Sequence, residues 1–500
     1  MSIVSVIGSG FSGLSSAACL AQAGHKVTVF EKNSLPGGRA RKLEEQGFVF
    51  DMGPSWYWMP DVFEKFYHRF DAMASDFYDL VRLDPSYRVF FSKDDILDVP
   101  AGEPALIAMF EKREAGSGNQ LRKFLEEGKY KYETGINNLV HKPGLSLIEL
   151  FDRKLLGGIF KLDVFKSMSK YVRKHFHDPG LIQLLEFPVL FLGAAPSKTP
   201  ALYSLMNYAD MSLGTWYPMG GMYKIVEAMH KIATDQGASF QFNREVVGME
   251  LDSNKIKSLQ INGAQIESDY VVASADYHHV EQKLLPPEFR KYSDRYWEKR
   301  AMAPSSLIFY LGVNKRLKNL LHHNLFFDQD FGLHSKEIYD HPSWPTNPLF
   351  YVCCSSKTDT TVAPEGHENV FILIPVAPDL IDTAETREKY FELVMNRMES
   401  LTGQSIKKNI IYKKSYAHQD FILDYHAFKG NAYGLANTVM QTANLKPSIV
   451  NNKVKNLFYT GQLTVPGPGV PPSIISGQVV AQELMRRNNH GQNKLVVNFE

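Results

Sequence analysis

The chain has 500 residues, a length that favours two to four structural units at about 150 residues per domain. Its composition, 44% hydrophobic and 22% charged, is that of a folded globular protein and excludes collagen-like, low-complexity and small disulfide-rich chains. Lysine plus arginine number 55 against 54 aspartates plus glutamates, a net charge of +1, so we expect no nucleic-acid partner.

The cysteines and the N-terminal residues indicate the compartment. Cys19, Cys353 and Cys354 are too few for a disulfide framework and predict a reducing setting. The first residues lack a basic n-region, and Gly8 interrupts their apolar run, which is atypical of a signal peptide. No stretch approaches the roughly 20 apolar residues that cross a bilayer. We therefore expect a cytoplasmic protein that could lie on a membrane but does not span it.

The N-terminal part predicts a strand–helix–strand unit. An apolar strand at 3–7 is followed by a glycine-rich turn, a helix of small residues at 14–23 and a second strand at 26–30. The turn carries the run GSGFSG at 8–13, and Glu31 follows the second strand. This is the dinucleotide-binding fingerprint in the context it requires.

Each residue of this fingerprint has a physical role. Gly8 permits the tight turn, Gly10 lets the backbone approach a pyrophosphate, and Gly13 lets helix and strand pack closely. The helix N-terminus stabilises the negative charge, and Glu31 would accept a hydrogen bond from a ribose hydroxyl. The sequence therefore predicts a dinucleotide site at this turn.

The middle of the chain is predicted to be mostly helical and is followed by alternating helices and strands like those of the first unit. Apolar residues at helical spacing predict an amphipathic helix at 62–70, and 104–208 reads as an inserted helical domain without a motif of its own. A helix at 223–234 and strands at 240–247 and 270–273 follow.

The C-terminal half predicts a second sheet and a return to the first domain. Strand-like runs at 307–313, 349–353 and 370–376 are typical of an antiparallel, substrate-facing sheet, and 456–487 reads as strand, Pro/Gly turn and helix. This order predicts interleaved domains, with nucleotide-binding parts at 1–95, 209–290 and 431–500, a helical insertion at 96–208 and a substrate-binding sheet domain at 291–430.

A second glycine pair lies just beyond Glu31. The run LPGGRAR at 35–41 is followed by GFVFDMGP at 47–54, so that arginines stand where further phosphate contacts are possible. This segment resembles the GG-doublet flavoproteins, which include amine oxidases and carotenoid desaturases. The resemblance implies that Arg39 lies near the pyrophosphate and that the segment through Pro54 lies close to the flavin.

The C-terminal motif narrows the resemblance. The run NLFYTGQLTVPGPGVPPSIISG at 456–477 predicts a strand, a rigid loop and a helix whose first amides can stabilise a reduced flavin. It resembles the bacterial phytoene desaturases, and supporting runs at 217–222, 271–276 and 309–313 extend the likeness over nearly the whole chain. Gln462 departs from the acidic or small residue often found there, a change that a main-chain contact would survive.

This resemblance implies an α/β fold, with a Rossmann-like FAD-binding domain of the amine-oxidase/phytoene-desaturase type. That domain is interleaved with a substrate-binding α+β domain and a helical membrane-associating insertion. Val246 would pair with adenine through its backbone, and Gly461 and Gln462 would approach the pyrophosphate. Val470, Ser473 and Ile474 would border the isoalloxazine. The implied FAD contacts are Gly8, Gly10, Phe11, Ser12, Gly13, Glu31, Lys32, Gly38, Arg39, Gly53, Pro54, Ser55, Val246, Gly461, Gln462, Val470, Ser473 and Ile474.

The resemblance also separates this chain from its relatives that oxidise amines. Those enzymes usually bracket the flavin with a pair of aromatic residues, and 464–475 contains none. Covalent attachment would need a nearby cysteine, and Cys354 is a hundred residues away in sequence. We expect a noncovalent FAD.

The substrate side is harder to identify from sequence. The tunnel for a C30–C40 polyene would look like ordinary core, with candidates Trp56, Tyr57, Trp58, Phe187, Phe191 and Trp216. No catalytic acid or base stands out. The 16 histidines show no metal-ligand spacing, and the adjacent His278 and His279 are expected to diverge. We therefore assign no metal.

A basic amphipathic segment at 145–176 offers a route for the lipid. It combines leucines and phenylalanines with lysines and can lie in an anionic membrane surface. An exposed helical hairpin is the alternative.

The sequence thus predicts an FAD-dependent phytoene desaturase that introduces double bonds towards lycopene, with a quinone or O2 as electron acceptor. We expect it in the cytoplasm, peripheral on the cytoplasmic membrane. A 3,4-desaturase, a C30 desaturase, a carotenoid isomerase, a flavin amine oxidase and a carotenoid carrier with a structural FAD stay open as alternatives.

Overall fold

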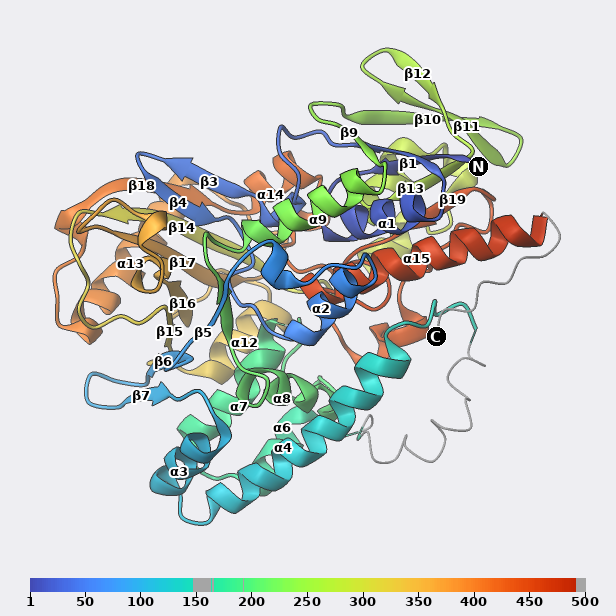
Figure 1. Ribbon diagram of the computed structural model, residues 1–500. Helices are drawn as coiled ribbons and strands as arrows, with labels where there is room; N and C mark the ends of the chain where they lie inside the picture. Colours follow the sequence, from blue (N-terminus) through green and yellow to red (C-terminus); the bar gives the residue numbers. More distant parts are fainter. Residues whose placement is uncertain (147–162, 164–165, 192, 492–500) are drawn as a thin grey trace.

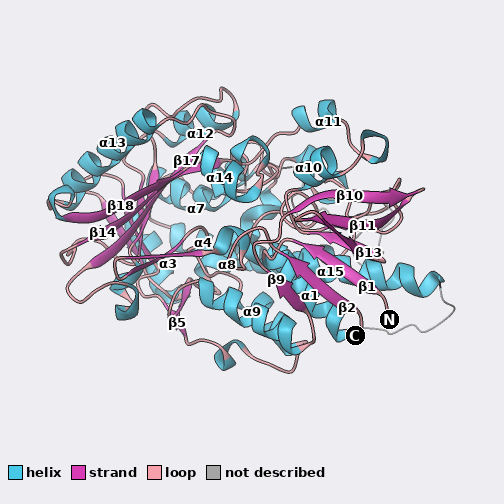
Figure 2. Ribbon diagram, turned by 90° about the horizontal axis from the view of Figure 1, so that it is seen from above, coloured by secondary structure: helices cyan, strands magenta, loops and turns pink. Residues whose placement is uncertain are grey.

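The computed structural model describes residues 1–146, 163, 166–191 and 193–491 (Figure 1). Its elements form two large sheets, with helices between and around them (Figures 1 and 2). None of the described helices combines the length and the apolar character that crossing a bilayer requires. The segment predicted to lie on a membrane falls largely outside the described residues, which omit 147–162 and 164–165.

The first sheet is parallel and has five strands in the order β19-β13-β1-β2-β9. Residues far apart in the sequence therefore share one sheet, which is what the interleaved order predicts. Its strands are β1 (Ile3–Ile7), β2 (Lys26–Phe30), β9 (Ser239–Gln241), β13 (Tyr270–Ala273) and β19 (Leu457–Tyr459).

Three helices pack beside this sheet, namely α1 (Phe11–Gln22), α9 (Tyr223–Asp235) and α15 (Val470–Gly491). Helices α1 and α15 lie side by side (Figure 1). Their close approach requires glycine at Gly477, because a Cβ there would lie 2.4 Å from the Ser12 carbonyl oxygen.

The second sheet has seven strands in the order β18-β14-β17-β16-β15-β6-β7 and is antiparallel except for the parallel pair β15–β6. Its inner strands are fully buried because helices cover both faces. The strands are β6 (Tyr87–Phe90), β7 (Ile96–Val99), β14 (Ser305–Val313), β15 (His323–Phe326), β16 (Phe350–Cys353), β17 (Glu368–Val376) and β18 (Ile410–Tyr416).

Different helices cover the two faces of this sheet. On one face, α13 (Ala384–Thr402) packs Phe391 and Met395 into the same core cluster as Phe309. The other face meets the helical part of the chain, in which α7 contributes Phe187. The elements of that helical part are α3 (Glu103–Arg113), α4 (Ser117–Thr134), α6 (Met168–His175), α7 (Pro179–Phe191) and α8 (Leu205–Met211).

The remaining elements are small. They are the hairpin β3 (Lys42–Glu45) and β4 (Phe48–Asp51), the pair β5 (Leu80–Arg82) and β8 (Trp216–Pro218), the three-stranded sheet β10 (Val246–Asp252), β11 (Lys255–Ile261) and β12 (Ala264–Glu267), and the helices α2 (Pro60–His68), α10 (Tyr277–His279), α11 (Asp294–Glu298), α12 (Phe331–Tyr339) and α14 (His418–Tyr425).

Two local expectations differ from the structure. The strand expected at 240–247 is broken into β9 and β10, because Asn243 adopts a left-handed conformation, with a φ of 53°, and turns the chain. Strand β6 pairs with β15 in the second sheet, although we placed it with the first nucleotide-binding part. The domain boundaries themselves stay a prediction.

Candidate functional site

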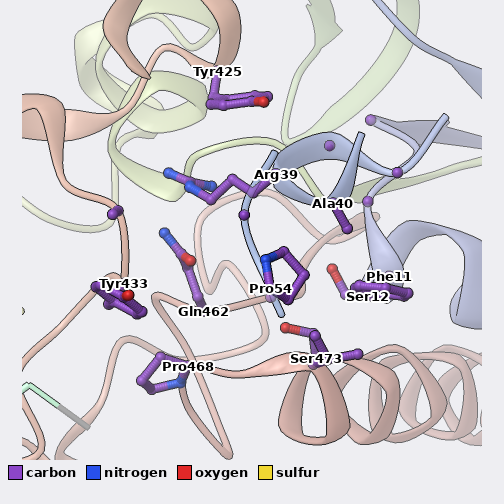
Figure 3. A pocket seen from close by; sticks show the side chains of 18 of the residues that line it. Phe11, Ser12, Arg39, Ala40, Pro54, Tyr425, Tyr433, Gln462, Pro468 and Ser473 are labelled. Atoms are coloured by element: carbon purple, nitrogen blue, oxygen red, sulfur yellow. The ribbon is translucent and has the colours of Figure 1, made fainter. Parts of the chain in front are cut away.

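A cavity of about 410 Å³ is lined by residues from both large sheets and from the C-terminal loop (Figure 3). Gly13 and Ile474 are the two implied FAD contacts that do not line it. The other implied contacts all do, namely Gly8, Gly10, Phe11, Ser12, Glu31, Lys32, Gly38, Arg39, Gly53, Pro54, Ser55, Val246, Gly461, Gln462, Val470 and Ser473. The structure thus brings them together around one space, and their contact with a flavin stays a prediction.

The glycine turn leaves the start of α1 open to this space. Gly10 is the N-cap of α1 and no side chain caps the helix there. A Cβ on Gly10 would meet nothing within 4 Å, whereas a Cβ on Gly13 would lie 2.1 Å from the Gly8 carbonyl oxygen. Gly13 therefore serves packing, and Gly10 faces free volume. The first amides of α1 are available to an anion in the cavity.

Glu31 is held in place by its neighbours in the turn. Its Oε2 accepts hydrogen bonds from the Ser9 amide at 2.9 Å and the Ser9 hydroxyl at 2.8 Å. Its Oε1 accepts from the Asn33 amide at 2.9 Å and the Asn33 side chain at 3.0 Å. These four hydrogen bonds use the roughly four acceptor positions of a carboxylate, so a ribose hydroxyl would share an oxygen with one of these donors.

Arg39 brings a cation into the cavity (Figure 3). Its Nη2 donates to the Asn431 carbonyl oxygen at 3.3 Å, and its guanidinium lies 5.2 Å from the centre of the Tyr425 ring. Burial lowers the pKa of Arg39, while Asp276 and Tyr425 act in the opposite direction. Its Nε is buried and has no hydrogen-bond partner among the described residues. A buried cationic donor without a partner is costly, and a phosphate would satisfy it.

The C-terminal loop closes the cavity from the other side. Gly461 has a φ of 108°, and its Cβ position would lie 3.2 Å from the Ser12 hydroxyl, so the loop passes close to α1. The Gln462 side chain donates to Asn431 at 3.2 Å. Ile474 does not reach the cavity because it is buried between the helices, where its carbonyl accepts a hydrogen bond from Ser15 at 2.7 Å.

Several lining residues were missed by the sequence reasoning. Asp276 follows β13, and its carboxylate accepts from the amides of His279 and Phe428. Neighbouring parallel strands end at the same edge, a signal that could have found Asp276. Tyr425 and Tyr433 also line the cavity (Figure 3). No local signal marks these two tyrosines, since tertiary packing alone brings them there.

The apolar part of the cavity holds half of the substrate-tunnel candidates. Trp56, Trp58 and Phe187 line it. Tyr57 points the other way and stacks on Phe63 at 4.3 Å between ring centres, because successive side chains of an extended segment alternate. Trp216 lies outside the wall, where its Nε1 donates to the Leu213 carbonyl oxygen at 2.9 Å. Tyr57 and Trp216 therefore do not line this cavity, and the side chain of Phe191 lies outside the described residues. Contact of any of the candidates with a polyene stays a prediction.

The titratable groups divide the cavity into two ends. Arg39, Glu31 and Asp276 gather at the end with the glycine turn. His279 lies at this same end, where its ring stacks on His426 beside Lys32, and burial together with His426 lowers its pKa to about 3. Burial raises the pKa of Tyr433 to about 12, so its phenol is neutral at physiological pH. The arrangement suits a charged dinucleotide at one end and an apolar molecule at the other.

Comparisons with known proteins agree with this geometry. The profile of the family described as flavin containing amine oxidoreductase matches residues 11–485. The chain is 40% identical to the carotenoid 3,4-desaturase of Haloarcula japonica over 96% of this chain and 98% of that protein. It is 32% identical to the zeta-carotene-forming phytoene desaturase of Myxococcus xanthus over 96% and 93%. An oxidoreductase from Methanosarcina mazei shares the fold, with a TM-score of 0.61 and 17% identity over 96% of this chain and 100% of that one.

Proposed function

Because the chain belongs to the flavin containing amine oxidoreductase family and, within it, to the carotenoid desaturases, we propose that it is an FAD-dependent carotenoid 3,4-desaturase. The observation that carries the flavin-dependent reaction on a lipid is the continuity of one cavity. A dinucleotide cradle with Gly10 and Arg39 and an apolar wall with Trp58 and Phe187 line the same space. A cofactor at one end would therefore meet a lipid at the other.

The residues present fit FAD. The uncapped start of α1 and the unpartnered Nε of Arg39 provide donors for a pyrophosphate, and Glu31 provides an acceptor for a ribose. None of the three cysteines lines the cavity, which supports noncovalent binding.

The chain itself mainly positions and desolvates the substrate. A bound flavin supplies the two-electron acceptor for removing hydrogen from adjacent carbons. Trp56, Trp58 and Phe187 exclude water from the apolar end and hold an extended hydrocarbon. Positive charge that develops on an allylic carbon is delocalised over the polyene, so the reaction does not depend on a strong base.

The choice of the 3,4-desaturation rests on similarity. The Haloarcula japonica protein is 40% identical to this chain and the Myxococcus xanthus phytoene desaturase 32%. Phytoene desaturation, our expectation from the sequence, is the second candidate, and the Myxococcus relative supports it.

The partners of the reaction are proposed from its chemistry. The electrons pass on to a quinone or to O2. The substrate partitions into lipid, so the enzyme works in the cytoplasm, bound peripherally to the cytoplasmic membrane. The basic segment at 145–176 supports this through its lysines and leucines.

The test is an anaerobic incubation of the FAD-loaded protein with carotenoids in liposomes, with a quinone added. The panel contains phytoene, lycopene and a C30 analogue, read by visible absorption and chromatography. A product from lycopene with a new double bond at C3–C4 is expected. Conversion of phytoene alone supports the second candidate. Peroxide formed from an amine in air, with every carotenoid untouched, would overturn both.

A further inference from the structure

Two histidines and a cysteine meet in the second sheet, away from the dinucleotide end of the cavity. Strands β15 and β16 are antiparallel, and their register places His323 directly opposite Cys353. His322 lies just before β15, and its ring centre is 4.5 Å from that of His323. One ring nitrogen of each histidine and the Cys353 Sγ all lie within 4.8 Å of one another. All three residues are buried.

The two imidazoles are held by their outer partners. His322 Nδ1 lies 2.7 Å from the Thr358 hydroxyl, and His323 Nδ1 lies 2.7 Å from the Tyr351 hydroxyl. The ring of His323 also stacks on Trp56, with centres 4.1 Å apart and an 11° angle between planes. Hydroxyl contacts at one ring nitrogen fix the orientation of the other, which is how metal-binding histidines are usually arranged.

The Nε2 atoms of both rings lack a hydrogen-bond partner within the described part of the chain. His323 is fully buried and His322 is 4% exposed, so solvent does not serve these atoms. A single unpartnered buried nitrogen is already uncommon. Two such nitrogens on adjacent residues of one buried cluster indicate that a ligand such as a metal ion is missing.

We propose that His322, His323 and Cys353 bind a thiophilic divalent cation of the zinc class. Neutral imidazole and thiolate are the donors that zinc prefers. Around a tetrahedral ion such donors stand roughly 3.3–3.7 Å apart, so each side chain moves by about 1 Å or less from its present place. Binding ionises the Cys353 thiol and releases its proton to solvent.

The charge around the site is compatible with such an ion. Asp359 is fully buried beside the cluster, and its carboxylate accepts a hydrogen bond from the hydroxyl of Tyr217, whose ring centre lies 4.6 Å from that of His322. A divalent ion and the thiolate leave one positive charge, which the neighbouring carboxylates of Asp359 and Asp51 can balance. Three protein ligands leave a fourth position for water.

The adjacent Cys354 shows that burial alone does not make such a site. It follows β16 and lies in a different core cluster, where its Sγ is 3.4 Å from Glu368. It is therefore a matched control, a cysteine one residue away with different neighbours.

The ion would act on the wall of the cavity. Tyr351 and Trp56 both line the cavity and both contact His323, and the Tyr351 hydroxyl also donates to Ser55 at 2.9 Å. A cation on the other side of the imidazole would lock these side chains in place. The proposal does not depend on which carotenoid the protein uses.

The first experiment uses the flavin-loaded wild-type protein. It is dialysed against a chelator, incubated with ZnCl2 and desalted, and zinc is measured per chain. About one equivalent is expected, with an X-ray absorption spectrum that shows one sulfur at about 2.3 Å and two nitrogens at about 2.0–2.1 Å. Less than about a tenth of an equivalent, or a shell without sulfur, would overturn the proposal irrespective of any variant.

The second experiment compares variants in the same assay. Cys353→Ser is expected to lose the sulfur shell and to retain less than about a tenth of the zinc, while Cys354→Ser behaves as wild type. Thr358→Val, which removes the hydroxyl on His322 Nδ1, should weaken zinc binding by about 10–100-fold. Flavin content reports folding in each case. Equal zinc retention in Cys353→Ser and Cys354→Ser would overturn the assignment of Cys353.

Discussion

Replacing Gly10 with valine separates cofactor binding from folding. The backbone at Gly10 has a φ of −68° and a ψ of 175°, which valine adopts without strain, and a Cβ there meets no atom within 4 Å. We therefore expect Gly10→Val to change the free energy of unfolding of the flavin-free protein by less than about 1 kcal/mol.

The same side chain occupies the space in front of the first amides of α1. A charge-assisted hydrogen bond to that turn is worth about 1.5–3 kcal/mol and the helix N-terminus up to about 2 kcal/mol. Losing one of each costs about 2–5 kcal/mol, which weakens FAD binding by about 30-fold or more.

Two measurements test this reasoning. Flavin content after desalting, followed by titration of the flavin-free protein with FAD, gives the loss of affinity. Thermal unfolding without flavin gives the stability, free of the contribution of bound ligand. Full flavin content in Gly10→Val would refute the assignment of this turn to the pyrophosphate.

Gly13→Ala is the matched control from the same turn. Its Cβ would lie 2.1 Å from the Gly8 carbonyl oxygen, so α1 must move away from the turn. We expect a loss of about 1–3 kcal/mol or more in stability before any cofactor is added. A normal unfolding temperature for Gly13→Ala, with a lowered one for Gly10→Val, would contradict the geometry on which both expectations rest.

Three further predictions follow from the cavity and its surroundings. Trp58 lines the cavity, so Trp58→Phe should lower kcat/KM for the carotenoid by about 3–10-fold at unchanged flavin content. Trp216 does not line it, so Trp216→Phe should change neither kcat/KM nor flavin content. Equal effects of the two variants in steady-state assays would contradict the placement of Trp58 in the cavity wall. Arg39→Gln should weaken FAD binding by about tenfold or more. Arg41 does not line the cavity, although its partner Asp424 does, so Arg41→Gln should weaken FAD binding less than Arg39→Gln in the same titration. Burial raises the pKa of Asp210 to about 7. The folded state therefore keeps a proton that the unfolded state loses near pH 4. The free energy of unfolding should fall by up to about 1.4 kcal/mol per pH unit between pH 4 and 7. Urea unfolding of Asp210→Asn should lack that slope, and parallel pH profiles would exclude the carboxyl as its source.

Local signals in the sequence determined the first unit and the cofactor class. The strands at 3–7 and 26–30 have the predicted bounds, and the helix after the turn begins at Phe11, three residues earlier than expected. Apolar periodicity and turn chemistry act between neighbouring residues, so one short segment carries all the information they need. Most of the implied flavin contacts also lie around one cavity. The motifs that carry them follow strands that end at the same edge of a parallel sheet.

Tertiary structure alone decided which apolar residues face the cavity. Trp56, Tyr57 and Trp58 are three aromatic residues in a row, and the sequence does not distinguish them. Side chains alternate along the extended segment, so Tyr57 points into the core while the two tryptophans line the cavity. Tertiary structure also decided which polar side chains lie close together. His323 and Cys353 are thirty residues apart, and only the register of β15 against β16 sets them opposite each other. Pairing between distant strands depends on how the whole sheet packs, and no spacing along the chain records it.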